Sequence, residues 1–392
     1  MGSINDEKDE RLLPGLPDEV VLDHVVPKLR WQDSHILSQV SRSWLEANRS
    51  RRTYAARVRS DSTEMFYVIY PDGDGDLDRL GLCPMSTHFW LELPEFPELS
   101  NFGDNYLPTN CQCISLDGKL YILGGWKCDD FVLHGSHSYT EEGGKVYVLD
   151  IAGQGQWKQC AKMPKPRQSF GCGVVDGKIY VFGGFIGLGS GKPTCKSLVY
   201  DPEANVWSSI RSMRRSSSPR RVVALGKELF VHSAQGGIEV YHVEKDEWRS
   251  LEPWQKHLDK KDEWRTLGEW QKTQHLFSET EKLFTAQGKL HMATLDGIYL
   301  YGILSDGTCS WTRLHSYDGF DGSQNDVHWY GEIESIDVLA GNDELVALVT
   351  FEFASSVYES QGFSSEEKVL SWDDVSSPDM MHVSPFMCSV QL

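Results

Sequence analysis

The sequence predicts a small all-α segment near the N-terminal end and a larger all-β body built from a repeated unit. The first observation is a stretch, Asp176-Gly177-Lys178-Ile179-Tyr180-Val181-Phe182-Gly183-Gly184, that is matched 59 residues earlier by Asp117-Gly118-Lys119-Leu120-Tyr121-Ile122-Leu123-Gly124-Gly125. The second is a change of hydrophobic spacing. Residues 12–25 place apolar side chains at helical intervals, whereas the later segments alternate between two faces, as strands do.

The repeated unit is predicted to contain four short strands. An Asp-Gly pair predicts a tight turn between the first two strands, because glycine tolerates the positive φ that such turns require. A third run ends in Asp in both copies, and a Trp follows in the predicted outer strand. The residues expected to hold the repeat together are Gly124, Gly125, Tyr147, Trp157, Gly183, Gly184, Tyr200 and Trp207.

A repeat of about 50 residues with a double glycine and a distal Trp resembles the kelch repeat. The resemblance implies that each unit forms one blade of a β-propeller. Weaker copies reach Trp248, Trp311 and Trp372, and an N-terminal unit with strands near 65–70 and 89–94 has no first strand of its own. Residues 386–392 are the expected donor of that strand, which predicts six blades closed by the C-terminal strand.

Composition restricts the partners and the compartment. The net charge of −19 would repel phosphate backbones, so nucleic acid is not an expected partner. No apolar run reaches the roughly 18 residues of a membrane helix, so no membrane partner is expected. The nine cysteines include no Cys-x-x-Cys pair. Free thiols in a reducing compartment are the better interpretation, and we expect a cytoplasmic or nuclear location, or both.

The N-terminal segment changes from period two to helical spacing at residues 12–21. Pro17 suits the start of a helix, and Asp18 and Glu19 complement the positive end of its dipole. A second helix is predicted from Asp33, with Trp44 one turn beyond its apolar residues. Three short helices of this kind are too small to be stable alone, so they need a neighbour or a partner.

This segment resembles an F-box, in which Leu-Pro-Asp-Glu opens an apolar helix and a later Val-x-x-x-Trp follows. The resemblance implies docking on the Skp-type adaptor of a cullin-RING ubiquitin ligase. The residues at the matching positions are Leu16, Pro17, Val20, Ile36, Val40 and Trp44. We therefore predict a disordered acidic N-terminus at 1–11, an F-box with a linker helix at 12–60, and a kelch propeller at 61–392. The alternative is that the helices only cap the propeller.

A basic cluster interrupts the acidic body between two predicted blades. Arg214, Arg215, Arg220 and Arg221 surround three serines, and Arg167 is expected to join them. Paired arginines can bind carboxylates or phosphates through two hydrogen bonds each, which predicts contact with an acidic or phosphorylated target. An ordinary solvated loop is the alternative.

Neither a cofactor nor a metal site is predicted. The acidic run at 72–78 lacks the glycine and glutamate of a calcium loop, and the glycine-rich run at 187–194 lacks the spacing of a phosphate loop. His134 and His137 have too few possible ligands nearby. In a near duplication at 245–272, with an offset of 16 residues, one copy is expected to form the outer strand of its blade and the other to lie outside the ring as a loop or short helix; a docking role for the second copy is left open.

The whole chain thus resembles a plant-type F-box/kelch-repeat protein. That resemblance implies a non-catalytic substrate receptor of an SCF (Skp-cullin-F-box) ubiquitin-protein ligase. Its partners would be the Skp-type adaptor, through it a cullin, and an unidentified target protein. A kelch scaffold acting outside a ubiquitin ligase is the alternative.

Overall fold

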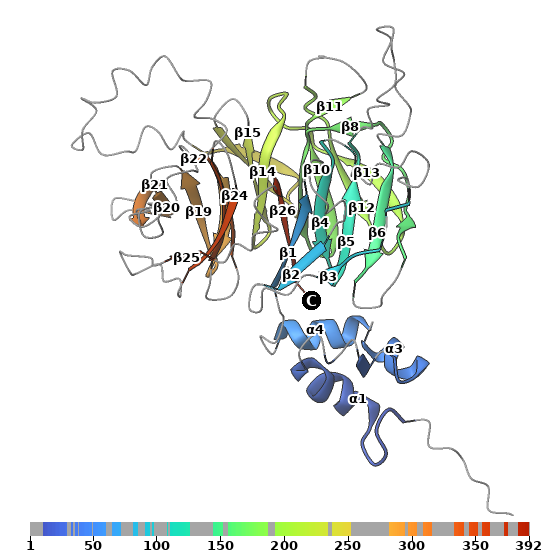
Figure 1. The fold of residues 1–392 in the computed structure, drawn as a ribbon. Helices are drawn as coiled ribbons and strands as arrows, with labels where there is room; N and C mark the ends of the chain where they lie inside the picture. Colours follow the sequence, from blue (N-terminus) through green and yellow to red (C-terminus); the bar gives the residue numbers. More distant parts are fainter. Residues whose placement is uncertain are drawn as a thin grey trace, which may run out of the picture.

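The protein is described by a computed structural model. The described residues are 11–29, 33, 36–37, 39–48, 50–59, 65–71, 81–84, 91–94, 96–97, 108, 110–125, 144–151, 156–186, 193–233, 237–251, 282–294, 297–303, 309–315, 333–340, 345–351, 355–360, 372–374 and 383–391. Their strands form four-stranded antiparallel sheets that stand around a common centre, with the helices on one side (Figure 1).

The first three sheets include both clear copies of the repeat. One contains β26 (Val383–Gln391), β1 (Met65–Pro71), β2 (Gly81–Pro84) and β3 (Leu91–Glu92). The next contains β4 (Gln112–Leu116), β5 (Lys119–Leu123), β6 (Val146–Asp150) and β7 (Lys158–Gln159). The third contains β9 (Gly171–Val175), β10 (Lys178–Phe182), β12 (Ser197–Asp201) and β13 (Val206–Ile210), with β8 (Arg167–Gln168) pairing β11 (Phe185–Ile186) beside it.

Three further sheets follow in chain order. They are β14 (Pro219–Leu225), β15 (Glu228–Ser233), β16 (Gly237–His242) and β17 (Glu247–Ser250); then β18 (Lys282–Ala286), β19 (Lys289–Thr294), β20 (Gly297–Ile303) and β21 (Cys309–His315); then β22 (Ile333–Ala340), β23 (Leu345–Phe351), β24 (Ser355–Ser360) and β25 (Trp372–Asp374). The predicted β-propeller arrangement is confirmed. The number of blades and the closure of the ring stay predictions.

The Asp-Gly turns have the predicted conformation. Asp117 and Gly118 have φ values of 51° and 68°, and Asp176 and Gly177 have 53° and 69°. Positive φ at both central residues is the mark of a type I′ turn, whose twist matches that of the strands that it joins. These two short sequences therefore fix the register of the first two strands in each copy.

The helices and the connecting loops lie at opposite ends of the sheets. The helical segment runs through α4 (Arg51–Arg59) into β1, whose first residue, Met65, pairs with Gln391 at the end of β26. In the two sheets that contain the clear copies of the repeat, this end carries the type I′ turns at 117–118 and 176–177. The opposite end carries the double glycines and the loop 211–218 (Figure 1). We call this end the loop face; its described residues are 124–125, 164–169, 183–186, 193–196 and 211–218.

The described N-terminal helical turns are less regular than a single α-helix. Helix α1 (Asp18–Val20) continues as a π-helical turn, η1 (Val21–Val25), and a 3-10 turn, η2 (Val26–Lys28). Asp33, Ile36 and Leu37 are helical, and α3 (Arg42–Asn48) precedes α4. Among the described residues, no helix has the length and apolar character that crossing a membrane requires.

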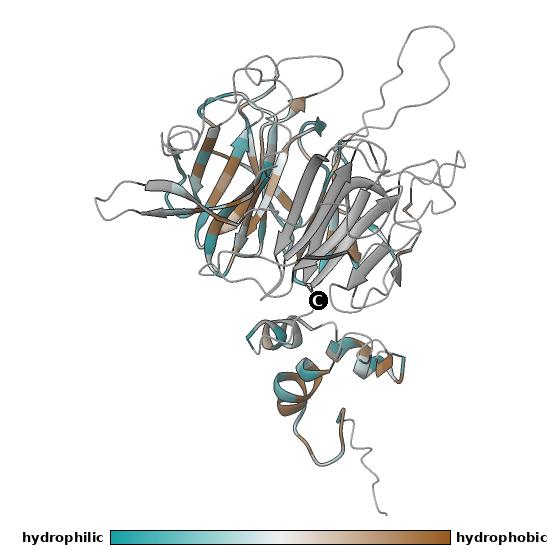
Figure 2. Ribbon diagram, turned by 60° about the vertical axis from the view of Figure 1, so that its left-hand side comes forward, coloured by the Kyte–Doolittle hydropathy of each residue, from teal (hydrophilic) through white to brown (hydrophobic). Residues whose placement is uncertain are grey.

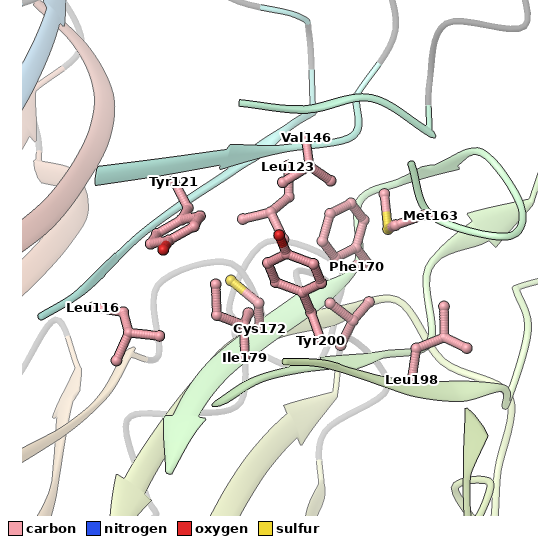
Figure 3. Packing of buried hydrophobic residues seen from close by; sticks show 11 residues of the cluster. Leu116, Tyr121, Leu123, Val146, Met163, Phe170, Cys172, Ile179, Leu198 and Tyr200 are labelled. Carbon is pink, nitrogen blue, oxygen red and sulfur yellow. The ribbon is translucent and has the colours of Figure 1, made fainter. Parts of the chain in front are cut away.

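Most of the core lies between neighbouring sheets. Figure 2 shows apolar residues along the coloured strands, and Figure 3 shows one cluster in which side chains from β5, β10 and β12 meet. Tyr121 and Leu123 from one sheet pack with Ile179, Leu198 and Tyr200 from the next. Because each sheet buries one face against its neighbour, the repeats stabilise one another rather than folding singly.

Candidate adaptor-docking and target-binding surfaces

The helical segment exposes an apolar set. Among the described residues, six large hydrophobic side chains are exposed, and four belong to this segment: Leu16 at 39%, Val20 at 38%, Ile36 at 62% and Val40 at 65%. All four are predicted adaptor-binding residues. Pro17 is also exposed and Trp44 is half-buried. Several exposed apolar side chains within one short helical segment are typical of a protein-binding region.

Local hydrogen bonds fix the two ends of this apolar set. Gly15 turns the chain with a φ of 84°, and the Leu12 N–H donates to the Asp18 carboxylate at 3.0 Å. Pro17 is the N-cap of α1 rather than its first helical residue. At the other end, the Trp44 N–H donates to Ser41 Oγ at 3.2 Å, so Ser41 caps α3.

Helix α4 holds the preceding helical turns in place. Arg52 donates two hydrogen bonds to the Asp23 carboxylate, at 2.9 and 2.7 Å, and this pairing lowers the pKa of Asp23 and raises that of Arg52. The buried Arg57 guanidinium donates to the carbonyl oxygens of Leu29 and Val26, at 3.1 and 3.3 Å. Sequence patterns did not indicate these contacts, because the partners are about 30 positions apart.

The Trp positions join neighbouring repeats. In three repeats the indole N–H of the Trp donates to a backbone carbonyl. Trp207 donates to Ala161 at 2.8 Å, Trp248 to Arg211 at 2.9 Å, and Trp157 to Pro94 at 2.9 Å. In each case the acceptor belongs to the preceding repeat and lies two residues before a buried apolar residue, which is Met163, Met213 or Phe96.

A second bond reinforces two of these joints. Asn205 Oδ1 accepts from the Ala161 N–H at 2.8 Å and from the Tyr200 hydroxyl at 2.7 Å. One repeat later, Asp246 Oδ1 accepts from the Arg211 N–H at 2.9 Å and from the Tyr241 hydroxyl at 2.7 Å. The spacing of five residues between Tyr and Asn or Asp was a signal in the sequence that the prediction missed.

The double glycines are sites of close backbone approach. The Gly125 N–H donates to the carbonyl of Arg167 at 2.9 Å, and the Gly184 N–H donates to that of Ser217 at 2.9 Å. A Cβ on Gly124 would lie 2.6 Å from the Arg167 carbonyl oxygen. The glycines are therefore required where the connection into the next repeat crosses the end of the second strand.

Tyr147 and Tyr200 are both buried, but they do not occupy equivalent positions. Val181 pairs with Leu198, and its counterpart Ile122 pairs with Tyr147. Tyr147 therefore corresponds to Leu198, two residues before the position of Tyr200 and on the same face of the strand. Its ring packs edge-on against Phe96, with centroids 4.8 Å apart.

Arg167 does not belong to the exposed basic cluster, contrary to the prediction. Its residue is 3% exposed, and its Nη1 donates to the carbonyl oxygens of Gly183 at 3.0 Å and Lys196 at 2.7 Å. Burial lowers the pKa of this guanidinium to about 10. Arg167 therefore bridges two backbone segments at the loop face and has no surface to offer a partner.

Arg214 and Arg215 do lie exposed on the loop face. Arg214 Nη2 donates to the Trp248 carbonyl at 2.7 Å, which directs this side chain toward the next sheet. Arg221 is half-buried in β14, and the side chain of Arg220 lies outside the described residues. The structure thus places two of the predicted arginines on one accessible loop.

A buried carboxylate lies beneath this loop. Glu239 on β16 accepts hydrogen bonds from the backbone N–H groups of Arg214 and Arg215, while burial, the larger effect, raises its pKa. The residue is 9% exposed, and its Oε2 has no hydrogen-bond partner among the described residues. Register places Glu239 opposite Val231, where the preceding repeat has Leu198 opposite Val181. The Glu239 carboxylate, at a position that is apolar in the preceding repeat, therefore anchors the loop 211–218 to the β14–β17 sheet.

Several predictions fall wholly or largely outside the described residues. These are the disordered terminus (1–10), the runs at 72–78 and 187–192, the two histidines at 134 and 137, and residues 252–272 of the duplication. Within the described part of the chain, no group of three or more His, Cys, Asp or Glu residues is arranged to hold a metal ion. No disulfide joins Cys111, Cys113, Cys160, Cys172 or Cys195 in that part of the chain.

The fold is a β-propeller arrangement of repeated four-stranded sheets, and the Kelch motif model matches residues 166–214. The chain is similar to F-box/kelch-repeat proteins of Arabidopsis thaliana. It is 30% identical to SKIP30 over 60% of this chain and 65% of that protein, and 26% identical to At1g67480 over 61% of each. The chain is 23% identical to the F-box protein AFR, over 64% of this chain and 67% of that protein. The predicted likeness to plant-type F-box/kelch-repeat proteins is confirmed. The chain matches less than two thirds of the first two relatives' length.

Proposed function

We propose that this protein is the substrate receptor of an SCF ubiquitin-protein ligase. The observation that carries the proposal is the exposed apolar set on the helical segment, at the positions that an F-box uses to bind a Skp-type adaptor. A small helical unit gains little by leaving such side chains in water, where each would contribute roughly 1.5–3 kcal/mol on full burial. The names of the similar proteins support the same role.

We further propose that the six sheets form one closed propeller. The first strands contact one another in the order β26, β4, β9, β14, β18 and β22, and β22 again contacts β26. The pairing of β26 with β1 joins the two ends of the body in one sheet, with Met65 opposite Gln391 and Val68 opposite Cys388. Closure of this kind removes exposed sheet edges and keeps the two faces a fixed distance apart.

The receptor acts by position. The helical unit at 12–60 binds the adaptor on one side of the ring, and the propeller at 61–392 holds the target on the loop face. The ligase's cullin and its other subunits bring the charged ubiquitin carrier to a lysine of the target. This chain raises the local concentration of the target and contributes no catalytic group. The proposed location is the cytoplasm, the nucleus or both.

The loop face is the proposed target-binding surface, and its target carries acidic or phosphorylated groups. Arg214 and Arg215 are exposed there, and Arg220 and Arg221 follow in β14. The remainder of the chain is strongly acidic, with a net charge of −19. A local positive site therefore selects an acidic segment and fixes its orientation more than it adds affinity.

Adaptor capture by the purified full chain tests the proposal. We expect the wild-type protein to retain a Skp-type adaptor, and the double variant Ile36→Ala, Val40→Ala to lose at least ten-fold in affinity, because the two most exposed apolar side chains are removed. Val206→Ala is the matched control, since Val206 is 52% exposed but lies on β13. Folded wild-type protein that retains no adaptor would favour a kelch scaffold outside the ligase.

A further inference from the structure

The loop after β13 contains three consecutive serines that differ sharply in accessibility. Ser216 is exposed, Ser217 is 1% exposed and Ser218 is half-buried. They follow Arg214 and Arg215 directly, and Pro219 follows them. The sequence treats the three hydroxyls alike, whereas the fold presents one of them to solvent.

The two inner serines are held by backbone contacts. The Ser217 carbonyl accepts from the Gly184 N–H at 2.9 Å, and its N–H donates to Thr194 at 3.4 Å. The Ser218 hydroxyl donates to the carbonyl of Ser169 at 2.7 Å. A kinase must surround the acceptor hydroxyl. Phosphorylation of Ser217 or Ser218 would therefore require the backbone contacts of these residues to open, including the one to Gly184.

The charge around Ser216 favours both recognition and the product. Arg214 and Arg215 immediately precede it, and residues 211–221 contain no carboxylate. A kinase with an acidic substrate-binding groove would bind these two guanidinium groups while it positions the Ser216 hydroxyl. After transfer, the phosphate would carry about −1.5 to −2 charges and would find donors within the same loop.

We propose that Ser216 is a phosphorylation site for a protein kinase that selects arginine on the N-terminal side of its acceptor. The Ser216 hydroxyl oxygen bonds to the γ-phosphorus of ATP, the bond from that phosphorus to the ADP oxygen breaks, and the hydroxyl proton passes to the kinase's base. The products are phosphoserine and ADP.

The phosphate closes the loop face to acidic targets, an effect that rests on the proposed function. The described part of this loop carries three guanidinium groups, from Arg211, Arg214 and Arg215. Arg211 has a carboxylate, Asp246, at 3.9 Å, and the buried Glu239 interacts electrostatically with Arg214 and Arg215 from beneath. A phosphate at Ser216 adds about two negative charges beside Arg214 and Arg215 and so offsets the positive charge that they present to a target. The basic site on this face is thereby switched by a single modification.

The first experiment treats the intact wild-type chain with ATP and an arginine-directed kinase, and maps the phosphate by mass spectrometry. We expect Ser216 to be the modified residue of the three, and Ser216→Ala to reduce incorporation into this loop at least ten-fold. Ser218→Ala is the matched control and should leave incorporation unchanged. Phosphate on Ser217 or Ser218, or an unmodified loop, would overturn the proposal.

The second experiment measures retention of the same samples on immobilised polyglutamate at low salt. We expect the unmodified chain to be retained, with at least a ten-fold loss after phosphorylation of Ser216. Equal retention before and after modification, or no retention of either form, would overturn the regulatory role. Adaptor capture by the same samples reports on the helical unit, so failure of the ligase proposal is seen separately.

Discussion

The indole nitrogen of Trp207 donates to the carbonyl of Ala161, 46 positions earlier, at 2.8 Å. The backbone N–H of Ala161 donates to Asn205 Oδ1, so the following repeat satisfies both backbone polar groups of Ala161. Buried or half-buried backbone groups must find partners, and here the partners come from the next repeat. The same bond at Trp157, Trp207 and Trp248 gives the distal Trp of these three repeats a common role.

Replacing Asn205 by Gly should weaken this joint. Gly tolerates the φ of 53° at this position, so the substitution removes the side-chain acceptor without adding backbone strain. We expect a loss of about 1–3 kcal/mol in the free energy of unfolding, measured by urea denaturation, because the Ala161 N–H and the Tyr200 hydroxyl lose an acceptor. Asn205→Asp should be nearly neutral, since Asp246 makes the same two bonds one repeat later.

A methyl group on Gly183 should destabilise the fold, because the added Cβ would overlap the carbonyl oxygen of Ser217. Gly226→Ala is the matched control. Its φ of 59° is close to the 61° of Gly183, but nothing lies within 4 Å of its added Cβ. In both variants the left-handed backbone conformation should cost about 1–2 kcal/mol in the free energy of unfolding. Overpacking should cost Gly183→Ala about 1–3 kcal/mol more. Equal unfolding midpoints for the two variants would contradict the close approach.

Arg167→Met should reduce stability rather than target binding. The substitution keeps an apolar chain of similar length but leaves the Gly183 and Lys196 carbonyls without the guanidinium donor. We expect a loss of roughly 1.5–3 kcal/mol in the free energy of unfolding, the range for hydrogen bonds to charged groups. Lys165→Met, an exposed neighbour, should change the unfolding midpoint little. A Met variant of wild-type stability that no longer binds polyglutamate would restore the predicted binding role.

Glu239 should make stability depend on pH in an identifiable direction. Burial raises its pKa above the ordinary 4.5, so its contribution to stability is greatest below pH 4.5 and is lost as pH rises through the folded-state pKa. Glu239→Gln removes this dependence. We expect the free energy of unfolding of the Gln variant, relative to wild type, to increase between pH 4 and 7. Glu247→Gln, an exposed change of the same charge, should show no such trend.

Much of the fold followed from local patterns. The turns at Asp117 and Asp176, the alternating strands after them and the exposed apolar positions Leu16, Val20, Ile36 and Val40 all depend on neighbouring residues, which a sequence displays directly. The third strand of the last sheet, β24, was missed. Its polar run, Ser355-Ser356-Val357-Tyr358-Glu359-Ser360, has little strand periodicity, and its pairing with β23 determines its conformation.

The candidate target surface was less predictable than the docking helices. Arg167, Arg214 and Arg215 are equal in a sequence, yet one is buried against backbone carbonyls and two are exposed on a loop. The difference comes from Gly183, Lys196 and Glu239, whose positions relative to the arginines depend on how neighbouring sheets are placed.

The repeat, its turns and the helical segment are visible in the amino-acid sequence, because they are set by backbone conformation and side-chain periodicity within a few residues. The burial of individual polar groups, the accessible serine of the 216–218 run and the face opposite the helices are visible only once the repeats are packed together. Those properties depend on contacts between residues about 15 to 60 positions apart, whose hydrogen bonds form only when one repeat is packed against the next.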